Sequence, residues 1–117
     1  MNIKIVIGNS SDDNASGMNN MTFLPESING DFEVQANVGN THTISGNVRV
    51  KSGVSFTNIG MIGGDVFVEA GASFRNIGMV QGNVLGEGHV EILGMVRGTV
   101  APTLQAVIHN GAVVYGK

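Results

Sequence analysis

Two neighbouring segments of this chain have almost the same sequence, and this repetition restricts the possible folds more than any other feature. Residues 52–69 read SGVSFTNIGMIGGDVFVE and residues 70–87 read AGASFRNIGMVQGNVLGE, an offset of 18 residues. The phrase returns as GMVRGTV at residues 94–100. A unit this short cannot bury its own apolar face, so the repeats must stack on one another to make a common core.

The repeat extends beyond these segments as rows of equivalent residues. A glycine preceded two places earlier by an aliphatic residue recurs six times, at spacings of 16, 18, 18, 16 and 18 residues. These pairs are Ile28/Gly30, Ile44/Gly46, Ile62/Gly64, Val80/Gly82, Val96/Gly98 and Val114/Gly116. Eight places before each glycine from the second onward stands a further apolar row, formed by Val38, Phe56, Phe74, Val90 and Ile108. Because this interval is constant, we expect the difference between 16 and 18 residues to fall in one adjustable corner.

The spacing inside each repeat distinguishes strands from helices. Apolar residues recur two or four positions apart, as in Ile62, Val66 and Val68, and not in the i, i+3, i+4 pattern of a helix. The consensus of leucine-rich repeats is also missing. The sequence therefore predicts an all-β, single-domain parallel β-solenoid (β-helix) of about six coils with 16–18 residues per coil, in which Val66 stacks on Val84 and Ile62 on Val80.

The repeat also sets the predicted domain boundaries. The β-solenoid domain is expected at residues 28–117, and residues 1–27 are expected to hold an N-terminal strand at Ile3–Ile7 and a flexible polar loop. This loop contains Asp12 and opens like a calcium-binding loop, but Phe23 stands where such a loop needs a bidentate glutamate. We therefore expect a linker there and no metal site.

Composition excludes several classes of function. The formal net charge is −3, and the six Lys and Arg residues are scattered, so no basic stripe is available for nucleic acid. There is no cysteine, which removes disulfides and thiolate zinc sites. The apolar run Ile3–Ile7 is too short for a signal peptide or a membrane span, so a cytoplasmic location is the default expectation and membrane association has no support.

No constellation of residues predicts catalysis. The three histidines are His42, His89 and His109, and the repeat places them on different coils, where they should not converge on a metal or a substrate. We expect three solvent-facing histidines at corners, no cofactor and no enzymatic activity.

Two further rows have possible roles. Asn40, Asn58, Asn76 and Asn110 are expected to form a ladder of stacked amides, interrupted by Ile92. Met61, Met79 and Met95 each precede an inward aliphatic residue, so they should point outward and form a stripe. This stripe is either a surface for a partner, or it turns inward or is covered by the N-terminal segment.

The coils resemble two known families. ISGNVRVKSGVSF, MVQGNVLGEGHVEILGMVRGTV and AVIHNGAVVYGK resemble coils of the bactofilins, bacterial cytoskeletal proteins, over about residues 28–117. This resemblance implies a compact β-helix that joins end to end into filaments and acts as a scaffold. The six-residue spacing from Ile44 through Val50 and Phe56 to Val80 is similar to that of hexapeptide-repeat left-handed β-helices, many of which are trimeric acyltransferases. No inserted catalytic loop accompanies it, so a small binding module or transferase-like trimer is the alternative.

The C-terminal coil is expected to be the site of assembly. Its apolar residues Val113, Val114 and Tyr115 have Lys117 as their only nearby charged residue. Exposed strand edges are usually blunted by charge, proline or a cover. We therefore expect the partner of this coil to be another copy of the same chain.

Overall fold

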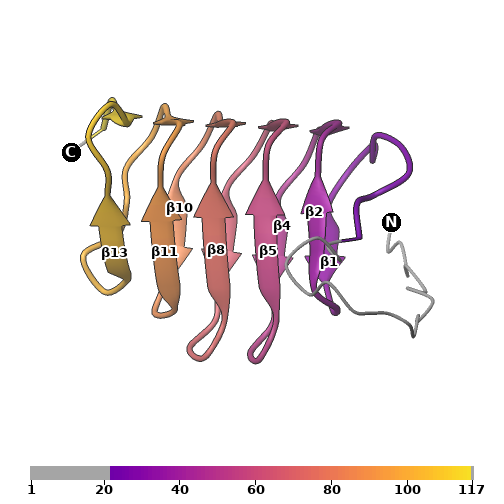
Figure 1. Cartoon of the computed structure of the whole chain (residues 1–117), viewed down its shortest axis with the longest axis horizontal. Coiled ribbons are helices and arrows are strands. Elements are labelled where there is room, and N and C mark those ends of the chain that lie inside the picture. Colours follow the sequence, from indigo (N-terminus) through magenta and orange to yellow (C-terminus); the bar gives the residue numbers. More distant parts are fainter. Residues whose placement is uncertain (1–21, 117) are drawn as a thin grey trace, which may run out of the picture.

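The protein is an all-β solenoid built from three parallel sheets. The structure, a computed structural model, describes residues 22–116, and these hold fourteen strands wound into coils along one axis (Figure 1). The first sheet is formed by β1 (Phe32–Val34), β4 (Val48–Val50), β7 (Val66–Val68) and β10 (Val84–Gly86). The second sheet is formed by β2 (Val38–Asn40), β5 (Ser55–Asn58), β8 (Ser73–Asn76), β11 (His89–Ile92) and β13 (Gln105–Ile108). The third sheet is formed by β3 (Thr43–Ile44), β6 (Met61–Ile62), β9 (Met79–Val80), β12 (Met95–Val96) and β14 (Val113–Val114).

The predicted fold class is confirmed, with about five turns in place of about six. The difference arises because the coils at the two ends of the described residues are incomplete. Before β1, the first coil contributes only isolated bridges, Phe23 to Gly39 and Ile28 to Ile44. After β10, the first sheet continues only as a bridge between Val84 and Val100.

Alternation along each short strand builds the core. In β7, Val66 and Val68 are fully buried while Phe67 between them is exposed, because neighbouring side chains on a strand point to opposite faces. Each inward residue lies on its equivalent in the next coil, so Val66 pairs with Val84. Ile62 pairs with Val80 in the same way, and both predicted stacks are confirmed.

Two of the three phenylalanines in the core stack in one row of the second sheet. The rings of Phe56 and Phe74 are 5.9 Å apart between centroids and nearly parallel, at 16°. Each fully buried side chain of this size contributes about 1.5–3 kcal/mol of transfer free energy. Each inward side chain packs on its equivalents in the neighbouring coils, so the coils must fold together.

The last coil departs from the predicted register. Val90 pairs with Ala106, and Ile92 pairs with Ile108, so Ile108 does not continue the row of Val90. Met95 then pairs with Val113, 18 residues on, whereas Ile108 follows Ile92 by 16. Two extra residues therefore lie inside the interval that the repeat predicted to be constant.

A single type of turn explains this shift. At Lys51–Val54 and Glu69–Ala72, the fourth N–H donates to the first carbonyl, and the third residue is a glycine with positive φ. Such a conformation favours glycine, as in a type II turn. In the last coil the same turn occurs at 109–112, with Gly111 at φ 91°, and so it lies between the second and third sheets instead of between the first and second. Asn110 therefore belongs to a turn and not to the asparagine row.

At the other end, the pairing begins before Ile28, where the repeat placed the start of the domain. The N–H of Leu24 donates to the carbonyl of Gly39 at 2.8 Å, and the N–H of Gly39 donates to the carbonyl of Thr22 at 2.8 Å. Leu24 is buried in the core. The predicted strand at Ile3–Ile7 and most of the polar loop lie outside the described residues.

Candidate functional site

The asparagine ladder is confirmed for three of its four predicted members. Asn40, Asn58 and Asn76 are each 0% exposed. The Nδ2 of Asn40 donates to Oδ1 of Asn58, and the Nδ2 of Asn58 donates to Oδ1 of Asn76, both at 2.9 Å. Asn58 and Asn76 also donate to backbone carbonyls within their own corners. These amides are fully used inside the protein, so the ladder is structural and offers nothing to a ligand.

A second ladder, which the sequence analysis missed, runs along another corner. Asp31, Asn47, Asp65 and Asn83 each accept, through Oδ1, the backbone N–H of the equivalent residue in the next coil, at 2.8–2.9 Å. Each of the four directly follows a glycine of the repeat, and this glycine–Asp/Asn pair was the available signal. A Cβ on Gly64 would collide with the Asn47 side chain, so the glycine allows the ladder to form.

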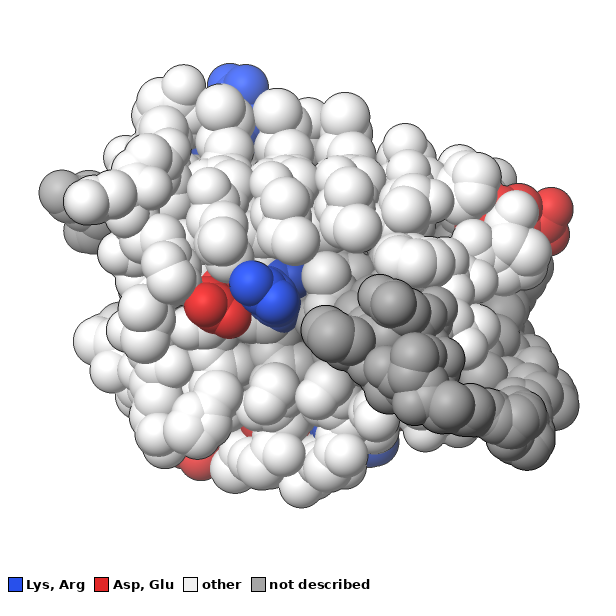
Figure 2. Space-filling view, viewed as in Figure 1, with Lys and Arg blue, Asp and Glu red and all other residues white. Residues whose placement is uncertain are grey.

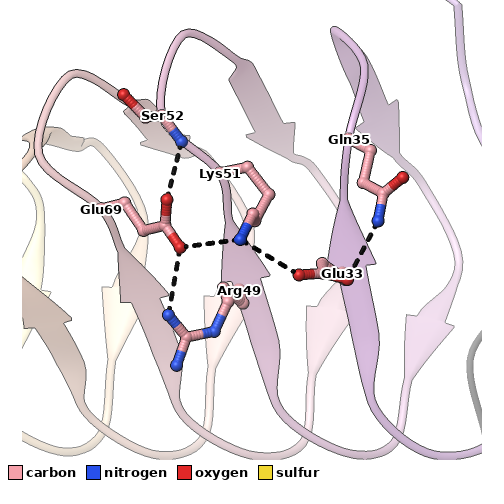
Figure 3. A network of polar contacts seen from close by, with 6 residues as sticks. All are labelled: Glu33, Gln35, Arg49, Lys51, Ser52 and Glu69. Atoms are coloured by element: carbon pink, nitrogen blue, oxygen red, sulfur yellow. Dashed lines mark hydrogen bonds and ion pairs between the residues drawn. The ribbon is translucent and has the colours of Figure 1, made fainter.

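Charged side chains form one connected network on the outer face of the first sheet (Figure 3). Glu69 accepts from the Ser52 N–H at 3.0 Å and contacts Arg49 at 3.1 Å and Lys51 at 3.2 Å. The Ser52 N–H, followed by Lys51, holds the pKa of the Glu69 carboxyl below its usual value. Glu69, followed by Glu33, raises the pKa of Lys51. The network links three successive coils of this face, and Glu33, Arg49 and Glu69 also line two shallow grooves beside it.

The outer face of the second sheet carries a smaller cluster. Arg75 Nε lies 3.4 Å from Glu91 Oε1, and His109 Nε2 lies 2.7 Å from Glu91 Oε2. In Figure 2 one red and one blue patch lie side by side near the middle of the view. Ser55, Ser73 and other residues of this sheet line a shallow groove of about 420 Å³ beside the cluster.

The three histidines do not form a site. All three are exposed, as expected, but His109 is paired with Glu91, while His42 lies beside the third sheet and His89 begins β11. Among residues 22–116, no group of three or more His, Cys, Asp or Glu side chains could hold a metal ion.

The methionine stripe is continuous. Met61 pairs with Met79 and Met79 with Met95, and Thr43 and Val113 extend this row at its two ends. The three methionines are half-buried and lie outward of the buried aliphatic residues that follow them. The row lines a shallow groove along the third sheet, and its use by a partner stays a prediction.

The last coil presents the largest exposure of apolar side chains that belong to core rows. Ile108 occupies the row of Ile92, which is fully buried, yet Ile108 is 51% exposed. All four residues of β13 are exposed, including Ala106 in the row of Val90. We call the end formed by β13 and β14 the open end.

The predicted assembly residues lie at this open end with different orientations. Val114 pairs with Val96, points toward the core and is half-buried. Val113 is exposed in the methionine row, and Tyr115 is exposed with Arg97 5.7 Å from its ring centroid. Ile108 was not predicted as an end residue because the repeat pattern placed it in the row of Val90, whereas it pairs with Ile92.

The residues of this end carry little charge. Residues 98–116 contain no Asp, Glu, Lys or Arg, although the chain as a whole is 13% charged. Two charged residues of the preceding coil contact this end: Glu91 contacts His109, and Arg97 lies against the Tyr115 ring.

Comparisons with known proteins do not assign a family. No protein-family model, curated protein or solved structure matches this chain. No helix within residues 22–116 is long and apolar enough to cross a membrane.

Proposed function

We propose that this protein is a non-catalytic, self-assembling scaffold whose copies join through the open ends of their solenoids. One observation carries the proposal: Ile108 is 51% exposed although its equivalent Ile92 is fully buried. A core row that stops half-exposed leaves apolar surface that a second apolar surface can cover.

A second copy of the same end fits this surface best. The strands β13 and β14 each have one edge paired with the preceding coil, through β11 and β12. Within residues 22–116 no strand pairs with their other edges, and a sheet edge of this kind is open to strand pairing. Two such ends related by a two-fold axis bring the same residues together from both sides.

The chemistry of the end supports burial in a contact between copies. Residues 98–116 contain no Asp, Glu, Lys or Arg, so joining two ends requires little desolvation of ions. The resemblance to bactofilin coils agrees with this proposal, since those proteins form filaments as cytoskeletal scaffolds. Contacts at both ends would build a filament, and a contact at one end would build a closed dimer. The size of the wild-type assembly in sedimentation velocity distinguishes the two.

The test uses two neighbouring residues of β13 as a matched pair. Ile108 points toward the core row, while Val107 lies on the outer face next to Glu91 and is 57% exposed. Both side chains are already about half-exposed, so neither Ile108→Lys nor Val107→Lys should unfold the inner coils.

We expect Ile108→Lys to shift the protein to a smaller assembly in sedimentation velocity while circular dichroism stays unchanged. Val107→Lys should keep the wild-type assembly. If both variants keep the wild-type sedimentation profile, end joining is wrong, and a discrete trimer in electron micrographs would favour the transferase-like alternative.

A further inference from the structure

We infer that Asn110 is a site of spontaneous chemical modification, where the side-chain amide deamidates to a carboxylate at the open end. Only two asparagines among residues 22–116, Asn29 and Asn110, directly precede a glycine. Glycine has no Cβ, so its backbone nitrogen can approach the preceding side chain closely, and an Asn-Gly pair therefore deamidates readily. The fold holds these two pairs differently, and this difference selects Asn110.

The reaction at Asn110 needs only water. The backbone nitrogen of Gly111 attacks Cγ of the Asn110 amide, and the succinimide ring closes as Nδ2 leaves as ammonia, which takes up the proton that the Gly111 nitrogen loses. Water then opens the ring at one of its carbonyl carbons, which gives aspartate or isoaspartate. The net change replaces an amide by a carboxylate, and isoaspartate also adds a methylene group to the main chain.

The surroundings of Asn110 leave this reaction unhindered. Asn110 and Gly111 are both exposed, at the two central positions of the turn at 109–112. The hydrogen bond that closes this turn runs from the N–H of Ala112 to the carbonyl of His109 at 3.1 Å, so it does not use the nitrogen of Gly111. Within the described part of the chain, neither the Gly111 N–H nor the Asn110 amide has a hydrogen-bond partner. Ring closure there breaks none of the hydrogen bonds of the described fold.

Asn29 is also exposed, but the next coil holds it in place. The N–H of Gly30 donates to Ser45 Oγ at 2.8 Å, and the Ser45 hydroxyl donates to Asn29 Oδ1 at 3.2 Å. The nitrogen and the amide that must meet are therefore both bound to one hydroxyl group. Ring closure at Asn29 has to break these two hydrogen bonds, so we expect this pair to react slowly while the protein is folded.

The consequence for assembly rests on the proposed end contact. The turn at 109–112 connects β13 to β14 at the C-terminal end of the solenoid (Figure 1), so Asn110 belongs to the coil that forms the open end. Residues 98–116 contain no Asp, Glu, Lys or Arg, and deamidation gives this segment a carboxylate. In a two-fold contact each copy brings its own carboxylate to the same interface, and like charges that meet there are unfavourable. Chains that stay unjoined until Asn110 has reacted therefore lose their ability to join.

Peptide mapping by mass spectrometry tests the site itself. The full chain with Ile108→Lys is incubated in the folded state at mildly alkaline pH, so that joined ends cannot shield Asn110, and circular dichroism verifies the fold. Deamidation should appear at Asn110 and be slower at Asn29 by at least about tenfold, a factor that the loss of two hydrogen bonds readily supplies. Asn110→Gln should remove the signal at this position. Equal rates at the two asparagines, or a faster reaction at Asn29, would overturn the assignment.

Ser45→Ala is the matched variant for the selection between the two pairs. Ser45 is exposed, and its N–H, which donates to the carbonyl of Ile28 at 3.0 Å, is kept, so the coil should stay folded. Without the hydroxyl group, Asn29 should deamidate faster by at least about threefold, while the rate at Asn110 stays the same. An Asn29 rate that is unchanged or lower would show that these hydrogen bonds do not select the site.

Asn110→Asp measures the effect on assembly separately from the chemistry. In the wild-type background this variant carries the carboxylate from the start, and the dissociation constant of the end contact should rise by at least about tenfold relative to Asn110→Gln. If the two variants assemble equally tightly while Ile108→Lys disrupts assembly, the end contact stands and its control by deamidation is wrong. If none of the three variants changes the sedimentation profile, the proposed end contact itself is wrong, and peptide mapping still decides whether Asn110 is the modified site.

Discussion

Replacing Asn58 with leucine tests whether the asparagine ladder holds the solenoid together. The Asn58 amide donates to Asn76 Oδ1 at 2.9 Å, to the Gly60 carbonyl at 3.1 Å and to the Met79 carbonyl at 3.2 Å, and its Oδ1 accepts from Asn40 at 2.9 Å. The two N–H groups of the amide are shared among three acceptors, so these contacts amount to about three full hydrogen bonds. Leucine has a similar size but can replace none of them.

The expected loss follows from these bonds. A buried hydrogen bond contributes about 1 kcal/mol net, so about three full bonds contribute about 3 kcal/mol. The gain from burying an aliphatic side chain in place of an amide returns about 1 kcal/mol. We therefore expect Asn58→Leu to lower the free energy of unfolding by about 2 kcal/mol, which lowers the melting temperature by about 8–16 °C in a domain of this size.

Thermal and urea unfolding followed by circular dichroism would measure this change. The control is Asn110→Leu, because Asn110 is exposed in the turn at 109–112 and has no place in the ladder. It should change the free energy of unfolding by less than about 0.5 kcal/mol. Equal stability losses in the two variants, or a loss below about 1 kcal/mol for Asn58→Leu, would refute the reasoning.

Two further substitutions test polar groups, one by adding an amide to the core and one by removing the charge of Glu69. Ile92→Asn should cost less stability in urea unfolding than Val90→Asn on the same strand, because only position 92 lies above the Asn76 amide; equal costs would contradict this. Glu69→Gln should destabilise the protein slightly at neutral pH. The folded-state pKa of Glu69 is lowered by the Ser52 N–H, so its contribution is present above the unfolded pKa of about 4.3 and is lost as the pH falls through the lower folded value. A difference between wild type and Glu69→Gln in melting temperature that persists at the lowest pH would argue against this.

The repeat predicted most of the fold because identical positions in a solenoid stack on themselves. An offset of 18 residues is enough to align Phe56 with Phe74 and Ile62 with Val80, and the structure pairs both. No knowledge of the turns is needed for this, since only the row assignment matters.

The last coil shows where such reasoning fails. The spacing of apolar residues alone allows the two extra residues to lie at either of two corners. The turn at 109–112 uses an Asn-Gly pair, and the same Asn was available for the ladder row, so the pattern matched the wrong alternative. A glycine at the third turn position, as at Gly53 and Gly71, was the signal in the sequence that could have identified the turn at Gly111.

The surfaces were less predictable than the core. The outward direction of Met61 follows from strand alternation, but the groove beside it depends on Gly78 approaching the preceding coil within a carbonyl contact. The pairing of His109 with Glu91 depends in turn on the shifted register of the last coil. The spacing of residues in the sequence predicts neither the approach of Gly78 to the preceding coil nor the contact of His109 with Glu91.

The change of chemistry along the ladder row bears on the proposed end contact. The row begins with amides at Asn40, Asn58 and Asn76 and continues as aliphatic residues at Ile92 and Ile108, so the ladder stops before the open end. An amide at position 108 would have no next rung, and burying it in a contact between two ends would leave it without its partner, at a cost of about 1–3 kcal/mol. An isoleucine at that position can be buried against another apolar surface without this cost. The ladder therefore specifies the register inside the solenoid, while the aliphatic residues that replace it leave the last coil suited to joining another copy.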